Sequence, residues 1–188
     1  MEALAEAFLS GGARLLQVRA KDAPSGEFLD VTRRIVRRAH DSGARVMVND
    51  RADIARMSGA DGVHVGQDDL AVGAVRGILG PRALVGLSTH TPEQLMAAPD
   101  GADYVAIGPV FATATKETGY EARGLDVVRT AARLAGGRRL PLVAIGGITL
   151  ERARDVLAAG ASSVAVIGDL VTDDPAARVA AYLERLTV

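Results

Sequence analysis

The 188-residue sequence contains no cysteine, and aromatic residues make up only 3% of it. Without cysteine there can be no disulfide, thiolate zinc site, iron–sulfur cluster or cysteine nucleophile. So few aromatic side chains also leave little to stack against single-stranded nucleic acid. Neither sign of charge is in excess, since 22 Lys and Arg nearly balance 23 Asp and Glu. A net charge of −1 gives no overall field that attracts nucleic acid or an anionic membrane, so we expect neither as a partner.

Long hydrophobic runs are absent too. No apolar run approaches the ~18 residues that a membrane span requires. The first residues, Met1-Glu2-Ala3, lack the basic and then apolar layout of a signal peptide. What is present, 48% hydrophobic and 24% charged residues, is ordinary globular composition. We therefore expect one soluble, cytoplasmic domain over residues 1–188.

Lysine is the scarcest basic residue. Only Lys21 and Lys116 are present, and arginine supplies the other basic residues. A sequence that uses arginine wherever any positive charge serves would keep lysine where a compact ammonium is required. Both lysines are therefore candidate functional residues.

Short runs rich in Val, Ile and Leu alternate with helix-length amphipathic stretches. Nearly continuous apolar runs are typical of strands that are buried on both faces. The expected strands are residues 15–18, 46–48, 62–65, 84–87, 104–107, 142–145 and 163–167. The expected helices are residues 3–9, 26–40, 52–57, 71–79, 92–98, 125–134, 150–159 and 175–186.

Strands that alternate with helices predict a parallel α/β sheet. Seven strands with eight helices fit a (β/α)8 TIM barrel that lacks its first strand. A seven-stranded doubly wound sheet is the alternative, but no Gly-x-Gly-x-x-Gly follows an early strand. The TIM barrel is the preferred fold.

Polar residues follow the early strands, where the active site of a barrel lies. Gln17, Arg19 and Lys21 alternate along the extended chain and fall on one side of it. Three donors on one side suit a polyanion such as diphosphate. A solvated surface triplet is the alternative interpretation.

Two carboxylates follow the next two strands. Asp50 comes after the second strand and Asp69 after the third. Carboxylates at neighbouring strand ends can share Mg²⁺, which completes its coordination with waters and substrate phosphates. Helix capping would explain either aspartate singly. His64 lies inside a strand and is expected to be a packed, hydrogen-bonded histidine and not a metal ligand.

Glycine-rich turns follow the last two strands. They contain Gly146-Gly147 and Gly168, and each offers backbone N–H groups beside a helix start, which is the usual phosphate cradle of barrel enzymes. Tight turns alone are the alternative. Ser88 follows the fourth strand, and Thr113, Thr115 and Lys116 follow the fifth. The diphosphate site after the early strands and the phosphate cradle after the last two strands together predict a transferase. Such an enzyme would release diphosphate while it holds a phosphorylated acceptor.

Eight motifs, in order along nearly the whole chain, match one known family. They are QVRAKD at 17–22, VNDR at 48–51, GVHVGQDD at 62–69, GLSTH at 86–90, DYV at 103–105, GPVFATATK at 108–116, AIGGI at 144–148 and VAVI at 164–167. In these motifs the sequence resembles the thiamine phosphate synthase family. The resemblance implies a (β/α)8 barrel that joins 4-amino-2-methyl-5-(diphosphooxymethyl)pyrimidine to thiazole ethyl phosphate. It also implies a dissociative, Mg²⁺-assisted release of diphosphate.

The resemblance implies a role for each matching residue. The diphosphate contacts would be Gln17, Arg19, Lys21 and Lys116, with the two lysines catalytic. The pyrimidine contacts would be Asn49 and Ser88, and the Mg²⁺ ligands would be Asp50 and Asp69. The thiazole phosphate contacts would be Thr113, Thr115, Gly147, Ile167 and Gly168. The two substrates are the expected partners, and a homo-oligomer is left open.

Two features depart from the family pattern. Members usually begin with a strand that ends in Thr-Asp, whereas this sequence starts at the helix that follows. A truncation, a wrongly chosen start or a real deletion would all look alike. Position 168 is Gly where many members carry Ser, so only a side-chain contact to phosphate is in doubt there.

Two alternatives to a synthase stay open on the sequence. A thiazole tautomerase of the same superfamily typically has His where Pro109 stands and lacks a metal aspartate at the position of Asp50, which favours the synthase. A non-catalytic, ligand-binding or regulatory relative is the second alternative, because loss of the first strand could abolish activity.

Overall fold

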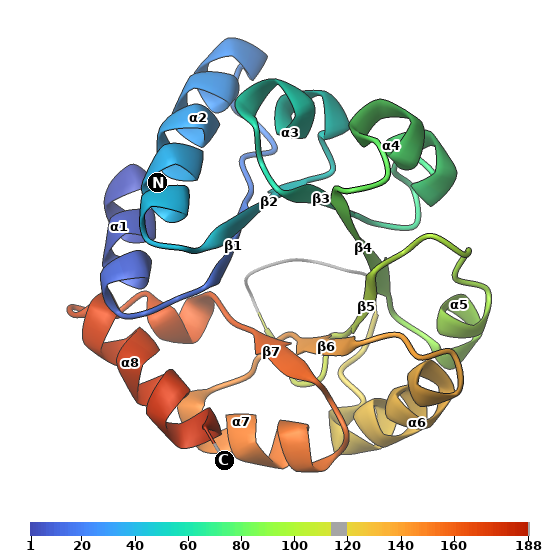
Figure 1. Cartoon of the computed structure of the whole chain (residues 1–188). Helices are drawn as coiled ribbons and strands as arrows, with labels where there is room; N and C mark the ends of the chain where they lie inside the picture. Colours follow the sequence, from blue (N-terminus) through green and yellow to red (C-terminus); the bar gives the residue numbers. More distant parts are fainter. Residues whose placement is uncertain (114–119, 188) are drawn as a thin grey trace.

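Seven parallel strands form one curled sheet with helices around it, as Figure 1 shows for the computed structural model, which describes residues 1–113 and 120–187. The strands are β1 (Leu15–Val18), β2 (Arg45–Asn49), β3 (Gly62–Val65), β4 (Leu84–Thr89), β5 (Tyr104–Ile107), β6 (Leu142–Ile145) and β7 (Ser163–Ala165). The helices are α1 (Glu2–Ser10), α2 (Ser25–Asp41), α3 (Ala52–Ser58), α4 (Val72–Leu79), α5 (Pro92–Met96), α6 (Gly124–Gly137), α7 (Leu150–Ala158) and α8 (Pro175–Leu186), with a short 3-10 turn η1 (Gly168–Leu170).

The order of the strands in the sheet is the order of the strands in the chain. Each strand pairs in parallel with the next, from β1 to β7. A doubly wound sheet reverses its strand order at a switch point, so that alternative is wrong. The α/β fold is TIM-barrel-like, as the alternation of strands and helices predicted.

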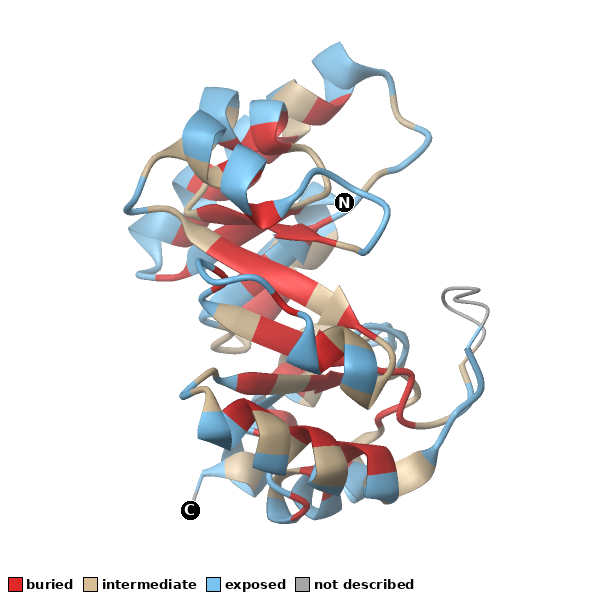
Figure 2. Cartoon of the chain, turned by 90° about the vertical axis from the view of Figure 1, so that its right-hand side faces the viewer, coloured by how far each residue is buried: buried red, intermediate tan, exposed pale blue. Residues whose placement is uncertain are grey.

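The core lies between the sheet and the helices. Buried residues gather on the strands and on the sides of the helices that face the sheet (Figure 2). Val63 and Val65 of β3 are completely buried, and α2 directs Phe28, Ile35 and Ala39 inward at helical spacing. The near-continuous apolar runs of the sequence are therefore buried strands, as expected.

The sheet has two edges, at β1 and at β7. Within residues 1–113 and 120–187, no strand pairs with the outer side of either. Helix α1 nevertheless packs against α8, so the helical layer continues across the place where the sheet is open (Figure 1).

Three strands differ from their expected bounds. β2 begins one residue earlier, at Arg45, where it pairs with β1, and it includes Asn49. β4 continues through Ser88 to Thr89. The backbones of Asn49 and of Ser88 and Thr89 still pair with β3 and β5, respectively. β7 instead ends at Ala165, before Ile167 and Gly168, since the chain turns there into η1. In the part of the chain that the structure describes, no helix is long and apolar enough to span a bilayer.

Candidate active site

A cavity of about 390 Å³ opens where the carboxyl ends of the later strands meet. The segments after β4, β5, β6 and β7 form its wall. Five residues that the sequence predicted for substrate binding lie in this wall: Ser88, Thr113, Gly147, Ile167 and Gly168. The structure therefore brings together residues that are up to 80 positions apart in the sequence.

The turn after β6 is built from two glycines. Gly146 and Gly147 have φ angles of 98° and 61°, which glycine adopts at little cost. A Cβ on Gly147 would also lie 2.5 Å from the carbonyl oxygen of Ala112 and 2.8 Å from Cβ of Phe111. Glycine is therefore required both by the backbone conformation and by the close approach of the segment that leads to Thr113. This turn delivers the chain to the start of α7 at the cavity wall.

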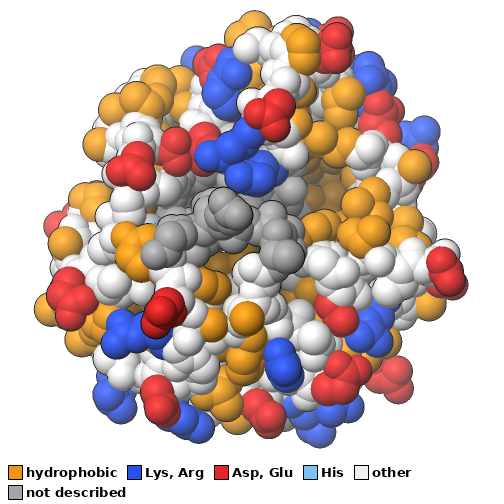
Figure 3. Space-filling model, turned by 180° about the vertical axis from the view of Figure 1, so that it is seen from behind, with side chains coloured by type: hydrophobic (Ala, Val, Ile, Leu, Met, Phe, Trp, Pro, Cys, Tyr) orange, Lys and Arg blue, Asp and Glu red, His pale blue; other side chains and the backbone are white. Residues whose placement is uncertain are grey.

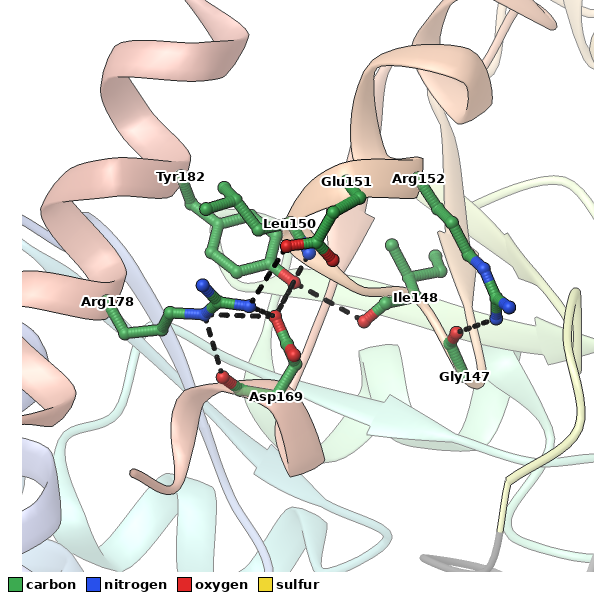
Figure 4. Close-up of polar contacts among 8 residues, drawn as sticks. All are labelled: Gly147, Ile148, Leu150, Glu151, Arg152, Asp169, Arg178 and Tyr182. Atoms are coloured by element: carbon green, nitrogen blue, oxygen red, sulfur yellow. Dashed lines mark hydrogen bonds and ion pairs between the residues drawn. The ribbon is translucent and has the colours of Figure 1, made fainter. Parts of the chain in front are cut away.

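Asp169 ties three elements together behind this turn (Figure 4). Its Oδ2 accepts hydrogen bonds from the backbone N–H of Leu150 in α7 at 3.0 Å, from Nη2 of Arg178 at 2.8 Å and from the hydroxyl of Tyr182 at 2.6 Å. Burial raises the pKa of the Asp169 carboxyl, but the hydrogen bonds from Tyr182 and Arg178 outweigh it, so the pKa lies below its ordinary value. The charged carboxylate thus holds η1 against the first turn of α7 and against α8.

Arg152 is a cation in the cavity wall that the sequence analysis missed. Its guanidinium carbon lies 4.6 Å from the centre of the Phe111 ring, and its Nη1 donates to the carbonyl of Gly147 at 3.4 Å (Figure 4). No carboxylate among the residues that the structure describes is close enough to form an ion pair with it. A cation in the first turn of a helix opposes the helix dipole, and this was the available signal in the sequence.

The predicted cation site lies at the ends of the early strands. Nζ of Lys21 is 3.4 Å from Oδ2 of Asp50, and Oδ2 of Asp69 accepts the backbone N–H of Gly66 at 2.8 Å. Burial raises the pKa of the Asp50 carboxyl, as do the hydrogen bond and charge of Asp69, while Lys21 opposes them. The two carboxylates therefore lie close to each other, and Asp50 lies beside the ammonium of Lys21.

The donor set at this place is suited to Mg²⁺ shared with a substrate. Two carboxylates that repel each other favour a divalent cation between them, and Mg²⁺ commonly takes one or two carboxylates plus phosphate oxygens and waters. Within the described ranges, no cluster of three or more His, Cys, Asp and Glu could hold a metal ion. The residues fit an ion completed by substrate oxygens. Asp50 also has a φ of 61°, a costly conformation for a non-glycine residue and one found most often at functional sites.

The other predicted residues lie around these two groups. Gln17 is exposed in β1 and Arg19 directly follows that strand, without a hydrogen bond to Lys21 in the described part of the chain. Asn49 ends β2 in register with His64. Thr115 and Lys116 lie outside the described residues. Figure 3 shows the face onto which the strands open, with basic and acidic side chains near its centre.

Both histidines of this region are hydrogen-bonded. His64 contacts Tyr104 through one ring nitrogen and Ser88 through the other, which agrees with the expected packed histidine. Nδ1 of His90, which lines the cavity, lies 2.6 Å from the carbonyl oxygen of Gly108. Because a carbonyl only accepts, Nδ1 of His90 carries the hydrogen.

Comparison with known proteins decides the family. The family model described as thiamine monophosphate synthase matches residues 1–170. The chain belongs to this family. It is 46% identical over 183 residues to the thiamine-phosphate synthase of Koribacter versatilis, covering 97% of this chain and 84% of that one. It is 49% identical over 166 residues to the thiamine-phosphate synthase of Anaeromyxobacter dehalogenans, covering 88% and 73%.

A solved structure agrees with this membership in the thiamine monophosphate synthase family. Thiamine phosphate pyrophosphorylase from Pyrococcus furiosus superposes with a TM-score of 0.87 at 30% identity, covering 98% of this chain and 90% of that chain. The family resemblance found in the sequence motifs is therefore confirmed, as are the barrel-like α/β fold and the transferase class.

Proposed function

We propose that the chain joins 4-amino-2-methyl-5-(diphosphooxymethyl)pyrimidine to thiazole ethyl phosphate and releases diphosphate. The observation that supports this most is the division of the site into two anion-binding parts. Lys21 lies beside Asp50, which in turn contacts Asp69, at the early strands, and the glycine turn with Arg152 lines the cavity at the late strands. A diphosphate donor and a monophosphate acceptor would each have its own part of one strand-end face.

The donor half stabilises a leaving group. Gln17, Arg19, Lys21 and Lys116 would bind the diphosphate, and Asp50 and Asp69 would hold Mg²⁺. When bound, Mg²⁺ supplies charge neutralisation for the departing diphosphate. The compact ammonium groups do the same from the protein side, where charge builds up as the carbon–oxygen bond breaks.

The acceptor half holds the thiazole. Thr113, Thr115, Gly147, Ile167 and Gly168 would bind its phosphate, largely through backbone N–H groups, and the guanidinium of Arg152 would add a positive charge. The electron pair of the carbon–oxygen bond leaves with diphosphate, and the resulting pyrimidine methyl cation takes the lone pair of the thiazole nitrogen. No proton is lost from the thiazole nitrogen, so this step requires no general base.

The deciding experiment measures both products. The purified chain is incubated with the two substrates and Mg²⁺, and diphosphate and thiamine phosphate are quantified against reactions that lack one component. We expect both products in equal amounts, and neither without Mg²⁺. A change in the thiazole compound alone would instead indicate a tautomerase, and binding without any product would indicate a non-catalytic relative.

A further inference from the structure

A chain of hydrogen bonds crosses the interior of the sheet and ends at the cavity. The hydroxyl of Tyr104 in β5 lies 2.8 Å from Nδ1 of His64 in β3, and Nε2 of the same ring lies 2.8 Å from Oγ of Ser88 in β4. Ser88 lines the cavity, whereas His64 is buried. The side chain of Ser88 is therefore connected to Tyr104, a half-buried residue that does not line the cavity.

Gly86 is the residue that allows these hydrogen bonds to form. In the sheet it stands in register with His64 on one side and with Tyr104 on the other. A Cβ at Gly86 would overlap Cζ and the hydroxyl of Tyr104 and would come within 2.5 Å of Nδ1 of His64. The backbone of Gly86 does not have a positive φ, so space, and not conformation, requires glycine here. Tyr104 and His64 meet across the strand that carries Ser88 only because position 86 has no side chain.

Which atom donates in each of these two hydrogen bonds follows from the groups that can donate or accept. Burial, followed by the charge of Asp103, raises the pKa of Tyr104 to about 12, so the phenol keeps its hydrogen at neutral pH. Within the described residues the acceptor near this hydroxyl is Nδ1 of His64. An imidazole that accepts at Nδ1 carries its hydrogen at Nε2 when neutral. Nε2 then donates to Oγ of Ser88.

The opposite direction is unfavourable. If Ser88 donated to Nε2, the hydrogen on Nδ1 would point at the oxygen of Tyr104. The hydroxyl hydrogen of Tyr104 would then have no acceptor in the described part of the chain, and leaving such a group unpaired costs free energy. In the favoured direction, the hydrogen of Ser88 is not used by His64 and is available to a ligand in the cavity.

We propose that Tyr104 and His64 are positioning residues that fix the Ser88 hydroxyl as a hydrogen-bond donor toward the pyrimidine substrate, with Gly86 as the spacer that allows it. This inference rests on the proposed function for the identity of the ligand. The group that accepts from Ser88 is an aromatic ring nitrogen, because the exocyclic amino group of an aminopyrimidine is a donor. Ser88 thereby distinguishes the ring nitrogens from the amino group and sets the orientation of the ring.

The first part of the test does not depend on activity. The ¹⁵N chemical shifts of the imidazole nitrogens report which nitrogen carries the hydrogen. The chain has three histidines, and His64→Gln identifies the signals of His64. We expect the Nε2–H form in the wild type, and a loss of this preference in Tyr104→Phe, which removes the donor while keeping the ring. The Nδ1–H form in the wild type would overturn the proposal whatever the catalytic activity.

The second part measures kinetics in Tyr104→Phe. We expect kcat/KM for the pyrimidine diphosphate to fall about tenfold, as for the loss of one oriented hydrogen bond. The KM for thiazole phosphate should stay within about twofold of the wild-type value. In the background of Ser88→Ala, Tyr104→Phe should have no further effect, because the hydroxyl that it orients is gone. A merely structural tyrosine would lower activity equally in both backgrounds, and that result would overturn the proposal.

Tyr182→Phe is the matched control. It removes another tyrosine hydroxyl, one that donates to Asp169 at the acceptor half, so its effect should fall on the KM for thiazole phosphate. Both variants acting on the same substrate would overturn the proposal. A wild type with the Nε2–H form but without any product from the two substrates would overturn the proposed function and, with it, the role of Ser88 toward pyrimidine. The Nδ1–H form in an active wild type would overturn this inference alone.

Discussion

Lys21 is half exposed, and its ammonium lies 3.4 Å from the Asp50 carboxylate. A compact ammonium can approach both this carboxylate and a departing diphosphate, whereas the planar fork of arginine is longer and directs its donors differently. The Lys21→Arg variant should therefore lower kcat by a factor of about 10²–10³, as for other losses of a charge-stabilising donor. Steady-state kinetics of diphosphate release measure this effect.

The melting temperature is the control for Lys21→Arg. A half-exposed lysine contributes little to stability, so the melting temperature should not change. Full activity of the arginine variant would contradict the idea that this position requires lysine.

Arg152 offers a second test at the level of one side chain. Removing its guanidinium in Arg152→Ala should raise the KM for thiazole phosphate about tenfold or more, because a hydrogen bond between charged partners is lost. The KM for the pyrimidine diphosphate should not change. Arg154→Ala, an exposed arginine on the same helix that does not line the cavity, is the matched control and should behave like the wild type.

The Asp169 network acts at the level of elements, since it joins η1, α7 and α8. Asp169→Asn should destabilise the protein by about 2 kcal/mol, because it weakens hydrogen bonds from Arg178, Tyr182 and the Leu150 backbone. It should also raise the KM for thiazole phosphate, since the turn at Gly168 loses its attachment to α7. Denaturant unfolding and kinetics measure the two effects, and Asp155→Asn, an exposed aspartate of α7, is the control.

The same network predicts the pH dependence of stability. The pKa of Asp169 is lower in the folded protein than its ordinary value of 3.8. A group with a lowered pKa stabilises the fold above its unfolded pKa, and this contribution is lost as the pH falls through the folded pKa. The difference in stability between the wild type and Asp169→Asn should therefore be full near neutral pH and should shrink below about pH 4. A difference that persists unchanged at pH 2 would contradict this account.

Sequence periodicity predicted the strands well, because a strand that is buried on both faces has a nearly continuous apolar run. It placed β1, β3, β5 and β6 with their observed bounds. It ended β4 at Leu87 because polar Ser88 and Thr89 interrupt the apolar run, although their backbone pairing with β5 continues. Apolar residue types therefore predicted which residues are buried, but the backbone pairing of β4 extends past the buried apolar run.

The candidate site was predictable where chemistry follows a strand end, as for Asp50 and Asp69. Arg152 was missed, because its unfavourable place in the first turn of α7 is a weak signal and a solvated arginine on an amphipathic helix has the same pattern. The chain from Tyr104 through His64 to Ser88 depends on the register of three strands and on the empty space at Gly86. The spacing of these residues along the sequence does not by itself show that His64, Gly86 and Tyr104 lie in register, because that depends on how the three strands pair in the fold.

At the scale of the whole molecule, the two open sheet edges should limit stability. Among the residues that the structure describes, no strand pairs with the outer edge of β1 or of β7. Open sheet edges can pair with other chains. An added N-terminal segment with an alternating strand pattern, long enough to reach this place, should form several hydrogen bonds worth about 1 kcal/mol each. At about 2–4 °C per kcal/mol for a protein of this size, the melting temperature should rise by roughly 10 °C.

A Gly/Ser segment of equal length is the control for the added strand, since it cannot form a strand readily. Scanning calorimetry compares the two fusions, and light scattering compares their aggregation. Equal melting temperatures and equal aggregation of the two would show that the edges of β1 and β7 do not limit the stability of the molecule.

The contact between α1 and α8 has a consequence for the protein during its synthesis. Gly11, at the end of α1, lies so close to α8 that a Cβ there would overlap the carbonyl oxygen of Ala176 and approach Cβ of Val179 to 2.8 Å. Each strand can pair with the preceding one as soon as it leaves the ribosome, but α1 must wait for the last helix. At about 5–20 residues per second, that delay lasts on the order of ten to forty seconds for this chain. During this time the face of α1 that α8 will cover is open to chaperones.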